Sequence, residues 1–140
     1  MAQLLQYMTN HPLLAGFALA AAVAVLVYEL RASAQNQNAL SPQDAVRLLN
    51  QGATLLDVRP AEEFAAGHVR NARHLPMAQI ADAGNALKKF KDKPVIVCCE
   101  RGATSAAAIQ QLTRQGFTRV CNLRGGLSAW RSESLPLVRD

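Results

Sequence analysis

The first 30 residues of this 140-residue chain carry almost no charge. All 15 lysines and arginines lie at or beyond Arg31, and Glu29 is the only charged side chain before that point. A secretory signal peptide begins with basic residues, whereas the leading segment MAQLLQYMTNH has none. This absence counts against a cleaved signal peptide, although Ala32-Ser33-Ala34 resembles a small-residue cleavage site.

Cysteine and aromatic residues are also scarce. The three cysteines, Cys98, Cys99 and Cys121, fit neither a disulfide framework nor a zinc site, so we expect reduced thiols in a cytoplasmic setting. From Arg31 onward, 15 basic side chains face nine acidic ones, since Glu29 is the only one of the ten acidic residues that precedes it. No recognition motif or interleaved aromatic set accompanies this basic excess. Nucleic acid is therefore not an expected partner.

What the N-terminal segment does contain is an uninterrupted apolar run, LLAGFALAAAVAVLVY, from Leu13 to Tyr28. The run extends to Leu30 if Glu29 lies at its edge. A membrane-spanning helix needs roughly 20 predominantly apolar residues. Because the run has no polar face, it does not resemble the surface helix of a small soluble domain. A lipid bilayer is therefore an expected partner.

These patterns divide the chain into four parts. We predict a tail over residues 1–12, one transmembrane helix over 13–30, a polar linker over 31–40 and one folded domain over 41–140. Arg31 follows the apolar run directly. Because positive charge beside a span tends to stay inside the cell, the domain is expected to be cytoplasmic.

Helical and strand patterns alternate over residues 41–140. A helix capped by Ser41 and ended by Gly52 comes first. We expect strands over 54–58, 72–75, 95–98 and 117–123, and helices over 61–66, 80–90, 105–115 and 127–130. The apolar run over 95–98 is typical of a central strand covered on both faces. The alternation predicts an α/β domain with a mainly parallel sheet flanked by helices.

Cys99 directly follows the predicted central strand. In open α/β sheets, active sites form outside the carboxyl ends of the strands. Backbone N–H groups of the loop and the dipole of the following helix would favour a thiolate there. The alternative is that Cys98 and Cys99 are two small core residues, which is the commoner fate of cysteine. The tight-turning Gly102 and the hydroxyls of Thr104 and Ser105 favour a functional thiol.

Three segments, in order and at matching spacing, resemble the signature of the rhodanese-like domains. They are Leu56-Asp57-Val58-Arg59 with Glu63-Phe64, Gly67-His68-Val69, Ala72 and Leu75-Pro76; then VIVCCERGATS from Val95 to Ser105; and LRGGLSAW from Leu123 to Trp130. Together they cover about residues 41 to 137. The resemblance implies a rhodanese-like three-layer domain.

The resemblance also implies a sulfurtransferase with Cys99 as nucleophile. Its thiolate would take sulfur from a small anion such as thiosulfate or from a persulfide donor, and pass it to a thiol or cyanide. No metal or organic cofactor is required. Asp57 and Arg59 would form a supporting ion pair. The loop that would bind the substrate and the persulfide consists of Glu100, Arg101, Gly102, Ala103, Thr104 and Ser105.

Several residues leave the chemistry open. Many family members have arginine where Thr104 stands, and Arg101 either orients an anionic donor or lies in solvent. Glu100 places negative charge beside the thiol, which works against thiosulfate and favours a less charged donor. Cys98 belongs to the strand, and Cys121 is either an inert strand residue or a second, resolving thiol.

Two functions from other classes are alternatives to sulfur transfer. Protein phosphatases and arsenate reductases of the same fold use a C-x5-R loop, but the residues six after Cys98 and Cys99 are Thr104 and Ser105. A membrane-tethered docking or regulatory module, with a membrane-protein partner, is the stronger alternative. Inactive family members typically lose the cysteine, which is present here.

Resemblance to short single-span rhodanese proteins suggests the inner membrane of a prokaryote.

Overall fold

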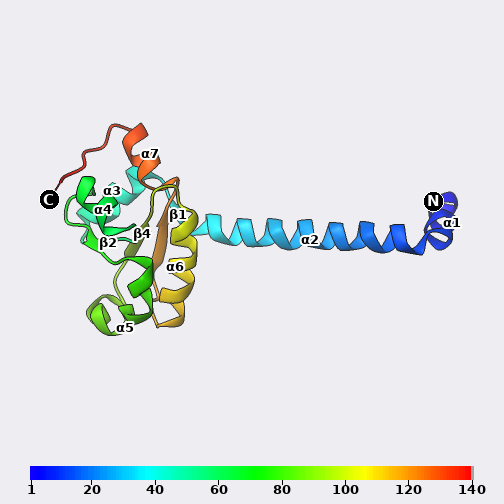
Figure 1. Ribbon diagram of the computed structural model, residues 1–140, viewed down its shortest axis with the longest axis horizontal. Coiled ribbons are helices and arrows are strands. Elements are labelled where there is room, and N and C mark those ends of the chain that lie inside the picture. Colours follow the sequence, from blue (N-terminus) through cyan, green and yellow to red (C-terminus); the bar gives the residue numbers. More distant parts are fainter. Residues whose placement is uncertain (140) are drawn as a thin grey trace. The chain divides into compact units, whose positions relative to one another are not determined.

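The computed structural model describes residues 1–139, and for residues 34–37 it describes the backbone alone. The chain divides into two compact units, Met1–Gln37 and Asn38–Asp140. The first unit contains the helices α1 (Ala2–Asn10) and α2 (Pro12–Gln37). The second unit is an α/β domain (Figure 1).

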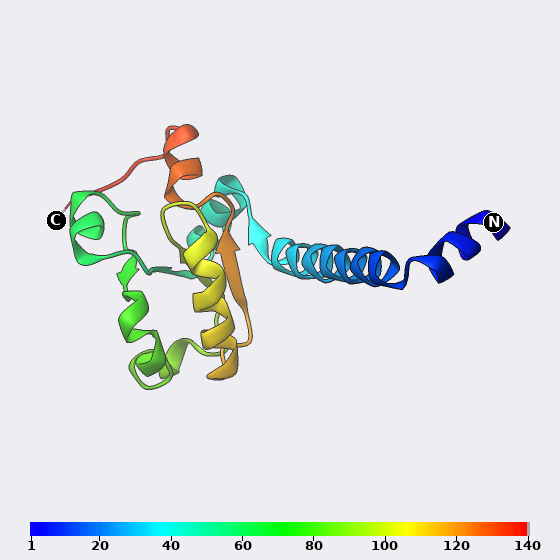
Figure 2. The same ribbon diagram turned by 45° about the vertical axis from the view of Figure 1, so that its right-hand side comes forward.

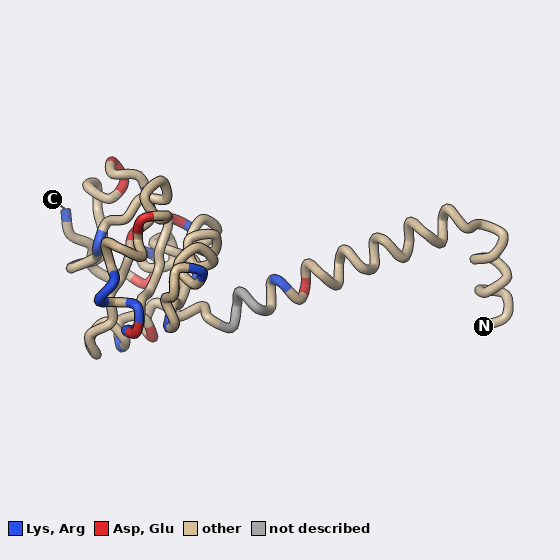
Figure 3. The backbone as a smooth tube through the Cα atoms, turned by 90° about the horizontal axis from the view of Figure 1, so that it is seen from below, with Lys and Arg blue, Asp and Glu red and all other residues tan. Residues whose placement is uncertain are grey.

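Helix α2 is long and apolar enough to cross a membrane. Its segment Pro12–Ser33 has a mean hydropathy of 2.2, and its large apolar side chains are exposed. A helix of this length spans about 33 Å, compared with a hydrocarbon core of about 30 Å. Figure 3 shows that the charged positions of α2 lie near its C-terminal end, where Glu29 and Arg31 stand in the sequence.

The segment predicted as a linker over 31–40 is helical and then extended. Helix α2 continues to Gln37, and strand β1 (Ala39–Leu40) follows. Strand β1 pairs in parallel with β5 (Val120–Leu123) and so forms one edge of the sheet. The domain therefore begins before Ser41, because the backbone groups of β5 need a hydrogen-bonding partner on that side. The segment predicted as a linker thus includes the first strand of the sheet.

Five parallel strands form the sheet, in the order β1-β5-β4-β2-β3. The remaining strands are β2 (Thr54–Asp57), β3 (Arg73–His74) and β4 (Val95–Cys98). All four residues of β4 are buried, as predicted for a central strand. The predicted α/β fold with a parallel sheet is confirmed. Because all strands run in one direction, their carboxyl ends meet along one edge of the sheet.

Helices cover both faces of the sheet. The helices of the domain are α3 (Pro42–Asn50), α4 (Ala61–Ala66), α5 (Ala83–Ala86), α6 (Ala103–Arg114) and α7 (Gly126–Ser132). Alternate residues of β4 point to opposite faces. Val95 and Val97 pack in a core cluster with residues of α5 and α6, and Ile96 and Cys98 pack in another with residues of α3 and α7. Figure 2 shows α6 lying along one side of the sheet.

The helix predicted over 80–90 is broken into three short pieces. They are the 3-10 helix η1 (Met77–Asp82), α5 and the 3-10 helix η2 (Lys88–Phe90). The side chain of Gln115 explains the break. Its Nε2 donates to the Ile80 carbonyl at 2.7 Å, and its Oε1 accepts from the Gly84 N–H at 2.5 Å. In a continuous α-helix these two backbone groups would bond to each other.

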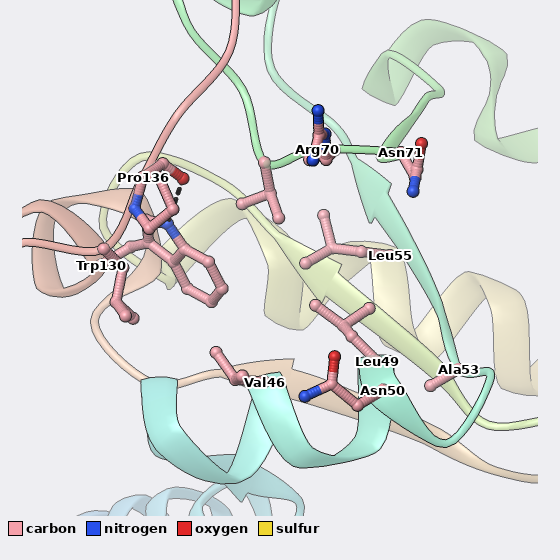
Figure 4. A pocket seen from close by; sticks show the side chains of 11 residues that line it. Val46, Leu49, Asn50, Ala53, Leu55, Arg70, Asn71, Trp130 and Pro136 are labelled. Carbon is pink, nitrogen blue, oxygen red and sulfur yellow. Dashed lines mark hydrogen bonds between the residues drawn. The ribbon is translucent and has the colours of Figure 1, made fainter.

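Trp130 anchors the C-terminal element on the α3 and α7 face. The indole is 3% exposed, and its Nε1 donates to the Pro136 carbonyl at 3.1 Å. A cavity of about 370 Å³ lies beside the ring, between Val46 and Leu49 of α3 and Leu55 of β2 (Figure 4). The cavity therefore adjoins the core on the face that contains Cys98.

Candidate active site

Cys99 lies at the carboxyl edge of the sheet, one residue beyond β4, and is 4% exposed. Its side chain belongs to the core cluster on the α6 face. The Gly102 N–H donates to Cys99 Sγ at 2.9 Å. Gly102 has a φ of +97°, a left-handed conformation that favours glycine because it has no Cβ. This conformation turns the loop so that a backbone N–H group faces the sulfur.

A buried hydroxyl also lies close to the sulfur. Ser105, in the first turn of α6, is fully buried, and its Oγ lies 3.5 Å from Cys99 Sγ. The same Oγ lies 2.8 Å from the Gly102 carbonyl oxygen and 2.6 Å from Asn122 Oδ1. Asn122 Nδ2 in turn donates to the Gly102 carbonyl at 3.5 Å. Strand β5 is thereby connected to the sulfur through Ser105.

The Gly125-Gly126 turn holds the cysteine loop from the side of α7. The Leu127 N–H donates to the Cys99 carbonyl at 2.9 Å, and the Ser128 N–H donates to the Glu100 carbonyl at 3.0 Å. These N–H groups belong to the first turn of a helix, which has no partner for them within the helix. Gly126 has a φ of +60°, and a Cβ there would overlap the Cys99 carbonyl oxygen. Only glycine therefore fits at this position.

The predicted ion pair between Asp57 and Arg59 is present and buried. Arg59 Nη2 lies 2.7 Å and Nε 3.0 Å from the carboxylate oxygens of Asp57, and the Asp57 carboxylate also accepts from the Arg59 N–H. Arg59 Nη2 additionally donates to the Gly67 carbonyl at 2.7 Å. A bidentate pair of this kind fixes the guanidinium in one orientation. It holds the chain that leaves β2 against the end of α4.

Two arginines bind the carboxylate of Glu100. Arg131 of α7 donates to both oxygens, and Arg59 Nη1 lies 3.5 Å from Oε2. Hydrogen bonding from Arg131 lowers the pKa of Glu100 and outweighs the opposite effect of burial, and the charges of Arg131 and Arg59 lower this pKa further. Glu100 is therefore ionised at neutral pH, with two cations beside it.

The remaining predicted site residues have different surroundings. Arg101, Ala103 and Thr104 are exposed, so they line the outer rim of the loop. Burial raises the pKa of Cys98 well above that of an ordinary thiol, and the charge of Asp57 adds to this effect. Burial also raises the pKa of Cys121, which is half-buried on β5. The raised pKa values favour neutral thiols at Cys98 and Cys121.

Two residues of the cluster were not predicted. Asn122 and Arg131 come to the loop across 17 and 31 residues of sequence, so no local pattern indicated their contacts. The one usable signal for Asn122 is a polar residue within an otherwise apolar strand, just before the LRGG segment. Within residues 1–139, no group of three or more His, Cys, Asp or Glu side chains could hold a metal ion.

The comparison with protein families agrees with this geometry. The model of the family described as "Rhodanese-like domain" matches residues 41–133. The match covers the sheet from β2 to β5, the cysteine loop and α7. The chain therefore belongs to the family of rhodanese-like domains, as the sequence motifs predicted.

Individual relatives support the same assignment. The chain is 34% identical over 141 residues to the "Uncharacterized protein YibN" of Escherichia coli (strain K12), with 99% of each chain covered. It is 40% identical over 93 residues to the thiosulfate sulfurtransferase GlpE of Pseudomonas fluorescens, covering 66% of this chain and 84% of GlpE. The crystal structure of a rhodanese-related protein from Thermoplasma volcanium superposes with a TM-score of 0.62 at 28% identity, covering 74% of this chain and 99% of that one.

Proposed function

We propose that this protein is a membrane-anchored sulfurtransferase that carries a sulfane sulfur on Cys99 as a persulfide. The observation that best supports the proposal is the 2.9 Å hydrogen bond from the Gly102 N–H to the Cys99 sulfur, at the carboxyl edge of a parallel sheet. A donor aimed at sulfur favours its anionic forms, the thiolate and the persulfide anion. The 40% identity to a thiosulfate sulfurtransferase supports the same chemistry.

The reaction is an exchange of one sulfur–sulfur bond for another. The Cys99 thiolate attacks the outer sulfur of the donor. The bond within the donor breaks, and sulfite leaves from thiosulfate, or a thiolate from a persulfide, with the bonding electron pair. An acceptor thiolate or cyanide then attacks the terminal sulfur of the Cys99 persulfide. This second step returns the Cys99 thiolate, and no external oxidant or reductant is consumed.

The charges around the loop favour a donor with little negative charge. Glu100 follows the nucleophile, and it already engages Arg59 and Arg131. A dianion such as thiosulfate would have to compete with this carboxylate for the two guanidinium groups. Arg101 and Thr104, both exposed on the loop, would contact the donor. We therefore infer that a persulfide is the better donor and thiosulfate the poorer one.

Helix α2 would attach the enzyme to the bilayer. Its exposed apolar surface over Pro12–Ser33 gains free energy in lipid and would be unfavourable in water. Arg31 after the span favours a domain on the cytoplasmic side of the inner membrane, where thiols stay reduced. A sulfur donor, an acceptor or a partner protein within that membrane would then be within reach of the domain.

The persulfide is tested by intact mass. The full-length chain, purified in detergent, is incubated with thiosulfate or with glutathione persulfide. We expect a gain of one sulfur atom that cyanide or dithiothreitol removes. The gain should persist in Cys98→Ala and Cys121→Ser and disappear in Cys99→Ser. No gain from either donor would instead favour a tethered docking module without sulfur chemistry.

Membrane attachment is tested separately in cells. The chain should stay in the membrane fraction after an alkaline carbonate wash and leave it with detergent. A variant with Leu19→Lys and Val23→Lys should appear in the soluble fraction, whereas Leu19→Ala with Val23→Ala should not. Protease should remove the domain from inside-out vesicles and not from intact spheroplasts. The opposite protease result would place the domain outside the cytoplasm.

A further inference from the structure

Asn122 reaches the sulfur cluster from β5 through Ser105. In the sheet, Asn122 lies directly beside Val97 of β4, two residues before Cys99. Paired residues of neighbouring strands point to the same face, so Asn122 is directed toward the α6 side, where Ser105 lies. Its carboxamide contacts the Ser105 hydroxyl at 2.6 Å and the Gly102 carbonyl oxygen at 3.5 Å. Asn122 therefore competes with Cys99 and Gly102 for hydrogen bonds with the Ser105 hydroxyl.

Ser105 has one hydroxyl proton and three acceptors within reach. They are Asn122 Oδ1 at 2.6 Å, the Gly102 carbonyl at 2.8 Å and Cys99 Sγ at 3.5 Å. While Cys99 is a thiol, its S–H donates to Ser105 Oγ, and the Ser105 proton is directed at one of the two oxygens. When Cys99 becomes a thiolate, the sulfur can only accept. The Ser105 proton is then best directed at the sulfur.

That reversal leaves the Ser105 oxygen in need of a donor. The Gly102 carbonyl cannot supply one, because a carbonyl oxygen only accepts. A carboxamide can supply one, since its NH2 group and its oxygen have nearly the same size and sit at equivalent positions. Half a turn of the Asn122 amide would bring Nδ2 to the position that Oδ1 occupies, 2.6 Å from Ser105 Oγ.

We propose that Asn122 is a positioning residue that reverses its hydrogen bond to Ser105 when Cys99 passes from thiol to thiolate or persulfide anion. In the anionic state the Asn122 N–H donates to Ser105 Oγ, and the Ser105 O–H donates to sulfur, so that each bond polarises the next. The S–H proton of Cys99 passes to solvent, and the rotation of the amide gives up the 3.5 Å hydrogen bond from Asn122 Nδ2 to the Gly102 carbonyl. The inference rests on the proposed function, because these anions are the states that sulfur transfer requires.

Other charges near the loop also act on the sulfur, and they are unchanged in the variants below. The titratable and charged groups of the loop, of β4, of β2 and of α7 are Glu100, Arg101, Cys98, Asp57, Arg59 and Arg131. Helix α6 and strand β5 contribute the neutral Ser105 and Asn122. The two linked hydrogen bonds from Asn122 to Ser105 and from Ser105 to Cys99 form a relay. Removing Ser105 interrupts the relay but leaves these charges in place, so the two effects on the sulfur can be separated.

The test is the pH dependence of Cys99 alkylation by iodoacetamide in the full-length chain. Fragment-ion mass spectrometry separates Cys99 from Cys98 and Cys121. Asn122→Leu keeps the shape of the side chain but removes both the donor and the acceptor. We expect the midpoint pH of alkylation to rise and the rate at pH 7 to fall by about threefold, as for the loss of one neutral hydrogen bond, here the one that Asn122 donates to Ser105. In a Ser105→Ala background, Asn122→Leu should cause no further shift.

Asn122→Asp provides a second variant that preserves the size of the side chain. A carboxylate accepts the Ser105 proton and never donates, so the midpoint should rise by more than in Asn122→Leu. Part of this rise comes from the added charge and should remain in the Ser105→Ala background, whereas the part due to the relay should vanish. Equal shifts with and without Ser105, or no shift in either variant, would overturn the inference.

Sulfur loading of the parent protein is measured in the same preparation. If the parent gains no sulfur from thiosulfate or glutathione persulfide, the proposed sulfurtransferase is overturned, and the alkylation midpoints still decide the role of Asn122. If the parent gains sulfur but the midpoints of both Asn122 variants match that of the parent, only the relay is overturned.

Discussion

The two faces of the central sheet each receive one of two adjacent cysteines. Cys98 ends β4 and packs with Ile96 and Trp130 on the α3 and α7 face. Cys99 follows it, packs on the α6 face and receives a hydrogen bond from the Gly102 N–H. Burial raises the pKa of Cys98, so that thiol stays neutral. Of these two consecutive residues, Cys98 therefore serves in packing, whereas the sulfur of Cys99 has hydrogen-bonding partners.

The difference shows that the backbone around a cysteine determines its chemistry. Both thiols are buried, so exposure alone does not distinguish them. Cys98 packs in an apolar cluster beside the buried charge of Asp57, whereas the loop after the strand supplies Cys99 with an N–H donor and a hydroxyl. Two glycines in left-handed conformations, Gly102 and Gly126, make that loop geometry accessible.

The largest expected effect separates the two cysteines directly. Cys99→Ser should lower sulfur transfer from thiosulfate to cyanide by at least about a thousandfold, because a hydroxyl is a far weaker nucleophile than a thiolate. Cys98→Ala should change the rate by less than about twofold, since only packing is altered. Thiocyanate formation measures both. A large loss in Cys98→Ala with an intact fold would remove the contrast between the two faces.

The next effect concerns the support of the Cys99 loop. Gly126→Ala should destabilise the domain by about 2–4 kcal/mol, because a left-handed φ and overlap with the Cys99 carbonyl act together. Gly52→Ala is the matched control, with a φ of +99° and open space, and should cost about 1 kcal/mol. Trp130, the single tryptophan, reports urea unfolding by its fluorescence. Equal losses in the two variants would mean that contact with the loop contributes nothing.

A smaller effect tests the charge beside Cys99. Glu100→Gln should raise kcat/KM for thiosulfate by about fivefold at low salt, because it removes a repulsive charge and leaves Arg59 and Arg131 available to the dianion. The gain should shrink as salt increases. Glu62→Gln, an exposed change on α4, should have no comparable effect. An equal gain with a persulfide donor of lower charge would contradict the electrostatic explanation.

The smallest effect is the dependence of stability on pH at Glu100. Its pKa is lower in the folded protein than in the unfolded chain, so the ion pair stabilises the fold at pH values above about 4.3. This contribution is lost as the pH falls through the lower, folded-state pKa. Because the side chain is 41% exposed, the loss should be below about 1 kcal/mol. Urea unfolding of the parent and Glu100→Gln should differ at pH 7 and converge in acid.

Local patterns predicted much of the fold, and contacts over long distances in sequence account for what they missed. The strand over 95–98 and the helix over 61–66 have the predicted bounds, because an apolar run and a Pro–Gly pair mark them locally. Strand β1 was missed, since two residues carry no periodicity and form a strand only beside β5. The break near Gly84 depends on Gln115, which is 31 residues away.

The sequence alone determined the apolar N-terminal helix, the α/β class, the family and the position of Cys99 after the central strand. Those features depend on composition, periodicity and short motifs, which are local. Only the tertiary structure decided that Asn122 lies 2.6 Å from Ser105 and that Arg131 binds Glu100. These contacts exist because the parallel sheet and α7 bring distant segments to one edge, and no pattern in a linear sequence specifies the side chains that meet there.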